Sequence, residues 1–182
     1  MVKTTPISLI LITVGILTLS GCACCPTPYE GAYSAPETYP EWFNSNNAIV
    51  SEEEAYYGYA NVMAADSMKA VNGAVQRAKS RLSSNIANRL EAIRNDALIE
   101  FGSESRLDQS NFILALSKSD RTIVRVAEAN ETVAIASDST GYYGFAKVII
   151  EKQQLVERLD RTFSSYEKAW NSMKESEAFD NF

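Results

Sequence analysis

The most regular pattern of hydrophobic and polar positions lies between Asp66 and Gly102. Apolar residues recur there at steps of three and four, which places them on one face of a helix, while the other faces are mostly polar or charged. Asp66 suits the cap of the first turn, and Phe101-Gly102 makes a natural stop. The pattern predicts one long amphipathic helix with the buried stripe Met68, Val71, Val75, Ala78, Leu82, Ile86, Leu90, Ile93 and Ala97.

Three shorter segments have the composition of strands. Residues 55–62 (AYYGYANV) are rich in tyrosine and valine, which favour extended backbone. Residues 132–138 and 142–150 follow later in the chain, with Ser139-Thr140-Gly141 supplying a turn between them. We therefore expect one strand before the long helix and a β-hairpin after it.

Two further helices are predicted, one before and one after the hairpin. The first begins near Asp108, although the charged Asp120 interrupts its apolar face of Phe112, Leu116, Ile123 and Ala127. Because residues 122–124 are β-branched, a strand is an alternative for the far end of this segment. The second is a terminal amphipathic helix with apolar residues at helical steps: Leu155, Leu159, Phe163, Tyr166, Trp170 and Met173.

The order strand, helix, helix, strand, strand, helix predicts an α+β fold. We expect a small three-stranded sheet, antiparallel or mixed, with helices packed on one face. The predicted divisions are a signal peptide over residues 1–21, a lipidated proline-rich tether over 22–45 and a single α+β domain over 46–182. A domain of this length can form its own hydrophobic core.

The first 21 residues have the order of a bacterial secretory signal. Lys3 precedes an apolar stretch that is too short for a comfortable membrane span. The end of this stretch, Leu19-Ser20-Gly21-Cys22, resembles the lipobox of bacterial lipoproteins. That resemblance implies cleavage between Gly21 and Cys22, a diacylglyceryl thioether on Cys22 and an N-acyl chain such as palmitate. The alternative is an ordinary secreted protein in which Cys22 is a free thiol.

A proline-rich tether is expected between the lipid and the domain. Four prolines lie among small and polar residues over positions 23–40, and this composition favours extended backbone that could reach roughly 50 Å. Ala23 follows the lipobox, and the absence of aspartate there resembles lipoproteins sorted to the outer membrane. Cys24 and Cys25 are adjacent, which strains a disulfide between them, so we expect inert thiols or bridges between molecules.

The layout as a whole resembles a known group of proteins. A lipobox, a tether, the phrase Tyr39-Pro40-Glu41-Trp42-Phe43, a tyrosine-rich strand, a long helix and a late hairpin follow one another. This order resembles the LPP-type outer-membrane lipoproteins of Helicobacter and its relatives, a group similar to flagellar lipoproteins that build disks or rings around the motor. The resemblance implies a small α+β domain at the cell envelope, a flagellar association and no catalysis.

Little in the sequence suggests catalysis. There is no histidine, and all three cysteines lie in the tether, so the domain lacks the commonest general base, zinc ligands and thiol nucleophile. Ser165 and Lys168 match a bare S-x-x-K pattern, but we expect both on a solvated helix face. The run Glu52-Glu53-Glu54 offers oxygen ligands for a cation, although such runs are usually solvated. We predict no enzymatic activity, no metal and no cofactor beyond the lipid on Cys22.

Tyrosines are the candidate partner-binding residues. Flat amphipathic rings on strands can stack on sugars or on a partner's side chains, and the alternative is that they cover the sheet. The net charge of −6 argues against a nucleic-acid partner. We expect a structural or interaction role at the outer membrane, with the bilayer, a second copy or an envelope protein as partner; the alternative is a glycan- or peptidoglycan-binding or synthase-activating module. The candidates are Tyr56, Tyr57, Tyr59, Tyr142 and Tyr143.

Overall fold

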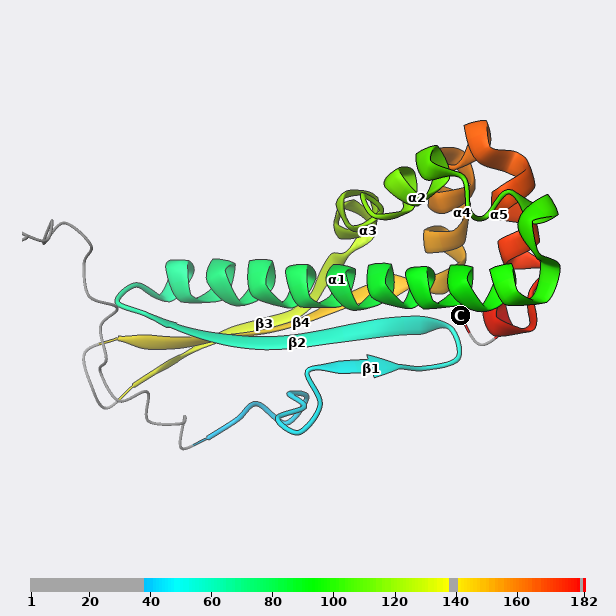
Figure 1. Cartoon of the computed structure of the whole chain (residues 1–182). Coiled ribbons are helices and arrows are strands. Elements are labelled where there is room, and N and C mark those ends of the chain that lie inside the picture. Colours follow the sequence, from blue (N-terminus) through cyan, green and yellow to red (C-terminus); the bar gives the residue numbers. More distant parts are fainter. Residues whose placement is uncertain (1–37, 138–140, 181) are drawn as a thin grey trace, which may run out of the picture. The chain divides into compact units, whose positions relative to one another are not determined.

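The computed structural model describes residues 38–137, 141–180 and 182, which belong to one compact unit, Pro36–Phe182. Its strands are arranged in the order β1-β2-β4-β3, and every pairing is antiparallel. The helix α1 lies along one face of this sheet, and the other helices gather around the C-terminal half of α1 (Figure 1). The predicted α+β class is confirmed. The strands are β1 (Ile49–Ser51), β2 (Ala55–Ala64), β3 (Glu128–Ala136) and β4 (Tyr142–Glu151).

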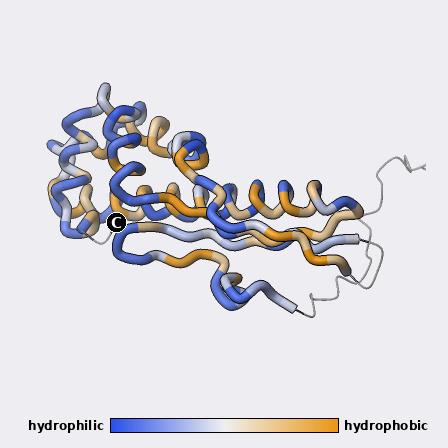
Figure 2. Tube along the Cα trace, turned by 180° about the vertical axis from the view of Figure 1, so that it is seen from behind, coloured by the Kyte–Doolittle hydropathy of each residue, from blue (hydrophilic) through white to orange (hydrophobic). Residues whose placement is uncertain are grey.

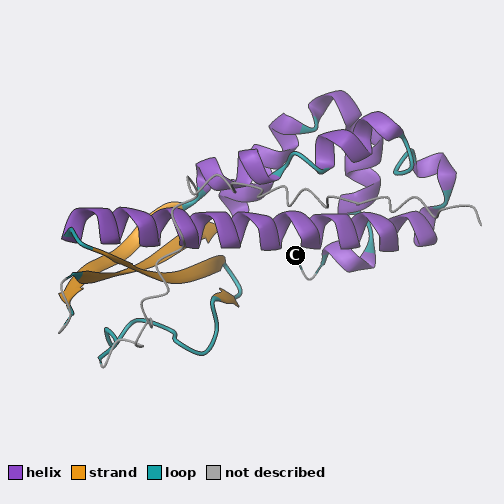
Figure 3. Cartoon of the chain, turned by 60° about the vertical axis from the view of Figure 1, so that its left-hand side comes forward, coloured by secondary structure: helices purple, strands orange, loops and turns teal. Residues whose placement is uncertain are grey.

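Five α-helices and three short 3₁₀ turns occur in the described part of the chain. Figure 3 shows that the helices lie on the same side of the sheet. The core residues among the described residues all belong to this unit. A shortened chain that starts at residue 26 therefore contains this hydrophobic core. The helices are α1 (Ser67–Phe101), α2 (Ser110–Leu116), α3 (Asp120–Val126), α4 (Lys152–Thr162) and α5 (Glu167–Lys174), and the turns are η1 (Ser103–Ser105), η2 (Ser164–Tyr166) and η3 (Glu177–Phe179).

The long helix forms where the pattern predicts it. The side chain of Asp66 accepts a hydrogen bond from the backbone N–H of Lys69 at 2.9 Å, so it caps the first turn. Gly102 ends the helix with φ at +65°, a conformation that glycine adopts without strain. From Ala78 onward the predicted stripe is buried.

The first two turns of α1 differ from the predicted stripe. Met68 is 72% exposed and Val71 is half-buried, whereas Ala70 and Ala74 are fully buried. The prediction followed the larger apolar residues, but the helix lies too close to the sheet there for large side chains. A Cβ on Gly144 of β4 would lie only 2.1 Å from the carbonyl carbon of Ala70.

The sheet contains one strand more than predicted. The additional strand, β1, has three residues, which is too short to show an alternating pattern, and it pairs with β2 from Ile49 to Ser51. The prediction of three strands is therefore wrong, as is the mixed alternative. β3 begins at Glu128 rather than at residue 132, because a register shift between Ala129 and Glu131 admits polar residues into the strand.

Two predicted helices are each divided into two. Residues 117–119 separate α2 from α3, next to Asp120, where the apolar stripe is interrupted. Residues 122–124 lie in α3, so the strand alternative for this segment is wrong. The terminal helix breaks after Thr162, just before η2, which lets Phe163 and Trp170 pack with their ring centroids 4.9 Å apart.

The two faces of the sheet bury different side chains. The face toward α1 contributes Tyr56, Ala60, Val148 and Ile150 to the main core. The opposite face, here called the open face, carries Tyr59, Tyr143 and Phe145. Figure 2 shows hydrophobic stretches along α1 and the strands of the sheet.

A segment over residues 38–48, here called the N-terminal segment, packs on the open face. The ring of Phe43 lies 5.1 Å from that of Phe145 and 6.0 Å from that of Tyr59, measured between centroids. Tyr39 stacks on Phe43 at 5.6 Å and meets the edge of Phe145. These contacts explain why Phe145 is fully buried although it lies on the face away from α1.

Candidate functional site

The predicted modification site lies outside the described residues. Gly21, Cys22, Cys24 and Cys25 all precede residue 38. Lipidation of Cys22 and cleavage after Gly21 therefore stay predictions from the sequence. Within the described part of the chain, no helix combines the length and the apolar character that crossing a bilayer requires.

Tyr56 is a core residue. It is 2% exposed, and its hydroxyl donates a hydrogen bond to the main-chain oxygen of Phe182. The side chains of Arg89 and Lys152 lie over its ring, at 5.9 and 4.9 Å from the centroid. Burial raises the pKa of the Tyr56 hydroxyl, and the nearby Arg89 opposes this only in part. The hydroxyl is thus a neutral donor that joins β2 to the end of the described chain.

Tyr59 and Tyr143 are also buried, but on the open face. Tyr59 meets the ring of Phe43 edge-on, and Tyr143 lies beside Phe145 with centroids 6.5 Å apart. The N-terminal segment packs over this aromatic group. Tyr39 and Phe43, which contribute to this group, precede residue 46, where the sequence analysis starts the domain.

The other two candidate tyrosines keep accessible surface, but they are not neighbours. Tyr142 is 38% exposed and pairs with Ala64 at one end of β2, whereas Tyr57 is half-buried near the other end. The structure therefore does not bring the five tyrosines together as one platform. A partner-binding role stays a prediction for Tyr57 and Tyr142, whose rings remain accessible.

Tyr57 belongs to a small charged group on the open face. The Lys147 ammonium lies 5.1 Å from the Tyr57 ring centroid and 3.2 Å from a carboxylate oxygen of Glu131. Burial by itself disfavours the charge of Lys147, but the hydrogen bond to Glu131 and the electrostatic contributions of Glu131, Tyr59 and Tyr57 together outweigh it and raise the pKa of Lys147 above its ordinary value. This ion pair joins β3 to β4 on the open face.

The remaining sequence candidates are solvated. Glu52, Glu53 and Glu54 are exposed in the turn between β1 and β2, and the described residues contain no group of three or more acidic side chains placed to hold a metal ion. Ser165 lies in η2 and Lys168 in α5, and both are exposed.

The outer edge of β3 is a candidate interaction site that the sequence analysis missed. β3 is the last strand of the sheet, so its outer backbone groups have no neighbouring strand among the described residues. Its first half carries Glu128, Glu131 and the register shift, which discourage pairing with another strand. Its second half, residues 132–136 (TVAIA), contains no charge and no proline, and Val133 is 36% exposed.

The side chains of this second half extend the open face. Val133 pairs with Phe145 and Ile135 pairs with Tyr143, so both side chains lie on the face that carries the aromatic group. An uncharged edge beside an apolar face can accept another extended chain through backbone hydrogen bonds. A signal was present in the sequence, because five uncharged, mostly β-forming residues occur together, but which strand forms the edge depends on the topology.

Comparisons of the chain with models of protein families, with curated proteins and with solved structures find no significant match.

Proposed function

We propose that this chain is a lipid-anchored protein of the bacterial cell envelope with a structural or interaction role rather than a catalytic one. The lipobox residues support the anchor, and the resemblance to LPP-type lipoproteins supports placement at the outer membrane. The observation that carries the interaction role is the uncharged half of the β3 edge, residues 132–136, beside the apolar open face.

The partner that this edge fits is a second copy of the same chain. Two β3 strands paired antiparallel about a two-fold axis at Ala134 place Val133 opposite Ile135 of the second copy. The same register places Glu131 opposite Ser137 of the second copy, so the acidic residues of the two strands do not face one another. The result is a continuous sheet in which Val133 and Ile135 of the two copies meet on the open face.

The anchor is tested in cells. We expect the chain to incorporate labelled palmitate and to fractionate with the outer membrane, and Cys22→Ser to abolish both. The amino-terminal peptide of the processed protein is expected to begin at Cys22 and to carry the mass of its acyl chains. An unmodified Cys22 in the processed protein would contradict lipidation and favour an ordinary secreted protein.

Self-association is tested by light scattering after gel filtration of residues 26–182, which contain the whole compact unit and no cysteine. We expect a defined oligomer, and Val133→Lys should shift it to monomer because it places a charge at the edge. Leu114→Lys is the matched control, because Leu114 is an exposed apolar residue of α2. A monomer at all concentrations, or equal effects of both variants, would contradict pairing through β3.

A further inference from the structure

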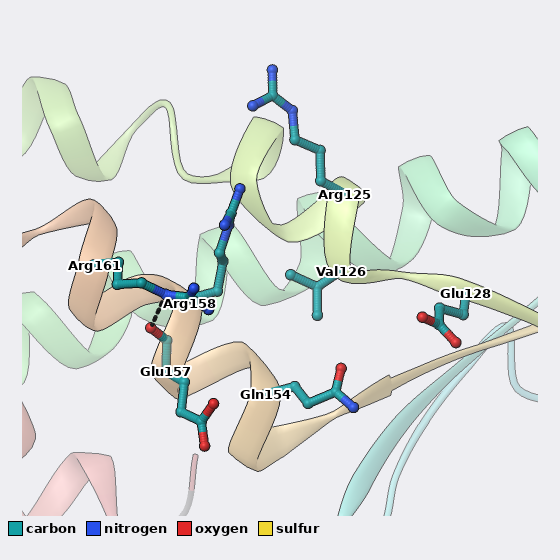
Figure 4. A pocket seen from close by; sticks show the side chains of 7 residues that line it. All are labelled: Arg125, Val126, Glu128, Gln154, Glu157, Arg158 and Arg161. Atoms are coloured by element: carbon teal, nitrogen blue, oxygen red, sulfur yellow. Dashed lines mark hydrogen bonds between the residues drawn. The ribbon is translucent and has the colours of Figure 1, made fainter.

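A cleft between α3 and α4 collects three arginines. It has a volume of about 470 Å³ and is lined by side chains from the end of α3, the start of β3 and the exposed side of α4 (Figure 4). Val126 lies in its wall. The polar residues that line it are Arg125, Glu128, Gln154, Glu157, Arg158 and Arg161.

Among the described residues, none of the three guanidinium groups forms an ion pair with a carboxylate. The ion pairs of Lys147 with Glu131 and of Lys174 with Asp160 do not involve this cleft. Arg161 donates from Nε to the main-chain oxygen of Glu157 at 3.2 Å, which holds its side chain along α4. Three like charges without a counter-charge repel one another, and a bound anion would relieve that repulsion.

The two glutamates of the cleft do not neutralise the arginines. Glu157 accepts a hydrogen bond from the side-chain amide of Gln153 at 3.2 Å, and Figure 4 shows its carboxylate pointing away from Arg158 and Arg125. Glu128 lies at the opposite end of the cleft from Arg161 (Figure 4). The arginine end therefore offers positive charge in a chain whose net charge is −6.

We propose that this cleft binds a phosphate group through Arg125, Arg158 and Arg161. A planar carboxylate is satisfied by one guanidinium fork, whereas a tetrahedral phosphate presents several oxygens and can accept from forks that come from two helices. Arg125 comes from α3 and the other two from α4, so the ligand would connect these helices. The phosphate belongs either to a soluble molecule or to a lipid headgroup.

The test uses residues 26–182 and measures phosphate binding directly. Inorganic phosphate and pyrophosphate are titrated at constant ionic strength while the Nε signals of the arginines are followed by NMR, with acetate as the carboxylate comparison. We expect saturable shifts of the signals of the three cleft arginines. Arg125→Gln and Arg158→Gln should each weaken binding about tenfold, because each removes a charge-assisted hydrogen bond.

The control variant is Arg81→Gln, which removes the same charge from an exposed position on α1. We expect it to change the affinity by less than about twofold, because exposed charges outside the cleft are screened. Arg125 is exposed, so its variant tests the site even if Arg158→Gln, at a half-buried position, fails to fold. Equal weakening by Arg81→Gln and Arg125→Gln would overturn the proposal, because it would show general attraction instead of a site.

Vesicle flotation distinguishes the two sources of phosphate. Binding to phosphatidylglycerol vesicles but not to phosphatidylcholine vesicles, lost in Arg125→Gln, would identify a lipid phosphate. Saturable binding of free phosphate without flotation would identify a soluble ligand. The absence of both saturable phosphate binding and arginine-dependent flotation would overturn the proposal. The three arginines lie outside residues 132–136 of β3, so a monomeric chain that binds phosphate would contradict self-association alone.

Discussion

Gly144 marks the closest approach between the long helix and the sheet. The position of its absent Cβ is occupied by the backbone of Ala70, whereas a Cβ on Gly58 of β2 would lie 3.0 Å from the Val148 side chain and 3.1 Å from the Ala78 carbonyl oxygen. Backbone cannot move aside as a side chain can, so only glycine fits at position 144. The contact lets α1 lie flat along β2 and β4.

We expect Gly144→Ala to destabilise the protein by about 3 kcal/mol or more, because the added methyl group forces α1 away from the sheet. Urea unfolding followed by circular dichroism measures this. Gly73→Ala is the control, since its added methyl would meet only the Val62 side chain at 3.1 Å and would gain helix propensity. Similar losses for the two variants would contradict a backbone clash at Gly144.

Asp160 is a second residue whose role depends on its surroundings. One of its carboxylate oxygens accepts hydrogen bonds from the Trp170 indole at 2.6 Å and from Lys174 at 2.8 Å. Burial by itself disfavours the charge, but these two bonds outweigh it and hold the pKa of Asp160 below its ordinary value of 3.8. Because the pKa falls on folding, ionised Asp160 stabilises the fold above that value, and the contribution disappears as the pH falls through the folded pKa.

Replacing Asp160 separates the two bonds. Asp160→Asn keeps an acceptor for Trp170, so we expect a loss below about 1 kcal/mol at pH 7, since the side chain is 43% exposed. Asp160→Ala leaves the buried indole N–H unsatisfied and should cost about 1–3 kcal/mol. The gap between wild type and Asp160→Asn should close below pH of about 4. A gap that is constant from pH 7 to pH 2 would contradict a role for the charge.

Among the elements, α1 has the most clearly defined start. The Asp66 side chain satisfies one of the first backbone N–H groups of the helix, which no carbonyl can reach. We expect Asp66→Ala to lower the free energy of unfolding by about 1 kcal/mol and Asp66→Asn, which keeps an oxygen acceptor, by only a few tenths. Thermal and urea unfolding measure both. Equal losses would show that the negative charge, rather than the acceptor, stabilises this end.

The C-terminal helices show where element prediction stopped working. The stripe from Leu155 to Met173 continues at helical steps, yet the chain leaves the helix after Thr162 and starts a new helix at Glu167. Ring packing of Phe163 against Trp170 and Phe112 favours the bend. A periodic stripe records which residues are buried, but it does not record where the backbone turns to bury them.

At the scale of the whole unit, Tyr56 and Phe182 join distant parts of the chain. The hydroxyl–carbonyl bond spans 126 positions in sequence, and the two rings pack with centroids 5.8 Å apart. We expect Tyr56→Phe to lower stability by about 1 kcal/mol, because it leaves a buried carbonyl with one acceptor site unused. Hydrogen exchange of residues 177–182 should quicken in parallel.

Tyr57→Phe is the matched control for this contact. Tyr57 lies on the same strand but on the open face, and its hydroxyl makes no hydrogen bond in the described structure. We expect removal of the Tyr57 hydroxyl in Tyr57→Phe to change the free energy of unfolding by less than about 0.5 kcal/mol. If Tyr56→Phe proves equally neutral, the hydrogen bond to Phe182 contributes nothing to the stability of the fold.

Local features were determined by the sequence alone. The long helix with its cap and stop, the α+β class, the hairpin and the buried faces of α2 and α3 all follow from spacing and residue type within short stretches, because helices and turns depend on near neighbours. The predicted lipobox is equally local, because it rests on the four residues Leu19-Ser20-Gly21-Cys22.

Only the tertiary structure decided which residues meet across the sheet and between helices. Burial of Tyr56, Tyr59 and Tyr143 depends on whether α1 or the N-terminal segment covers each face, and the exposure of the β3 edge depends on strand order. Arg125 and Arg158 line one cleft because α3 and α4 pack side by side. Contacts between residues far apart in sequence are set by how whole elements pack, and a periodic pattern carries no record of that packing.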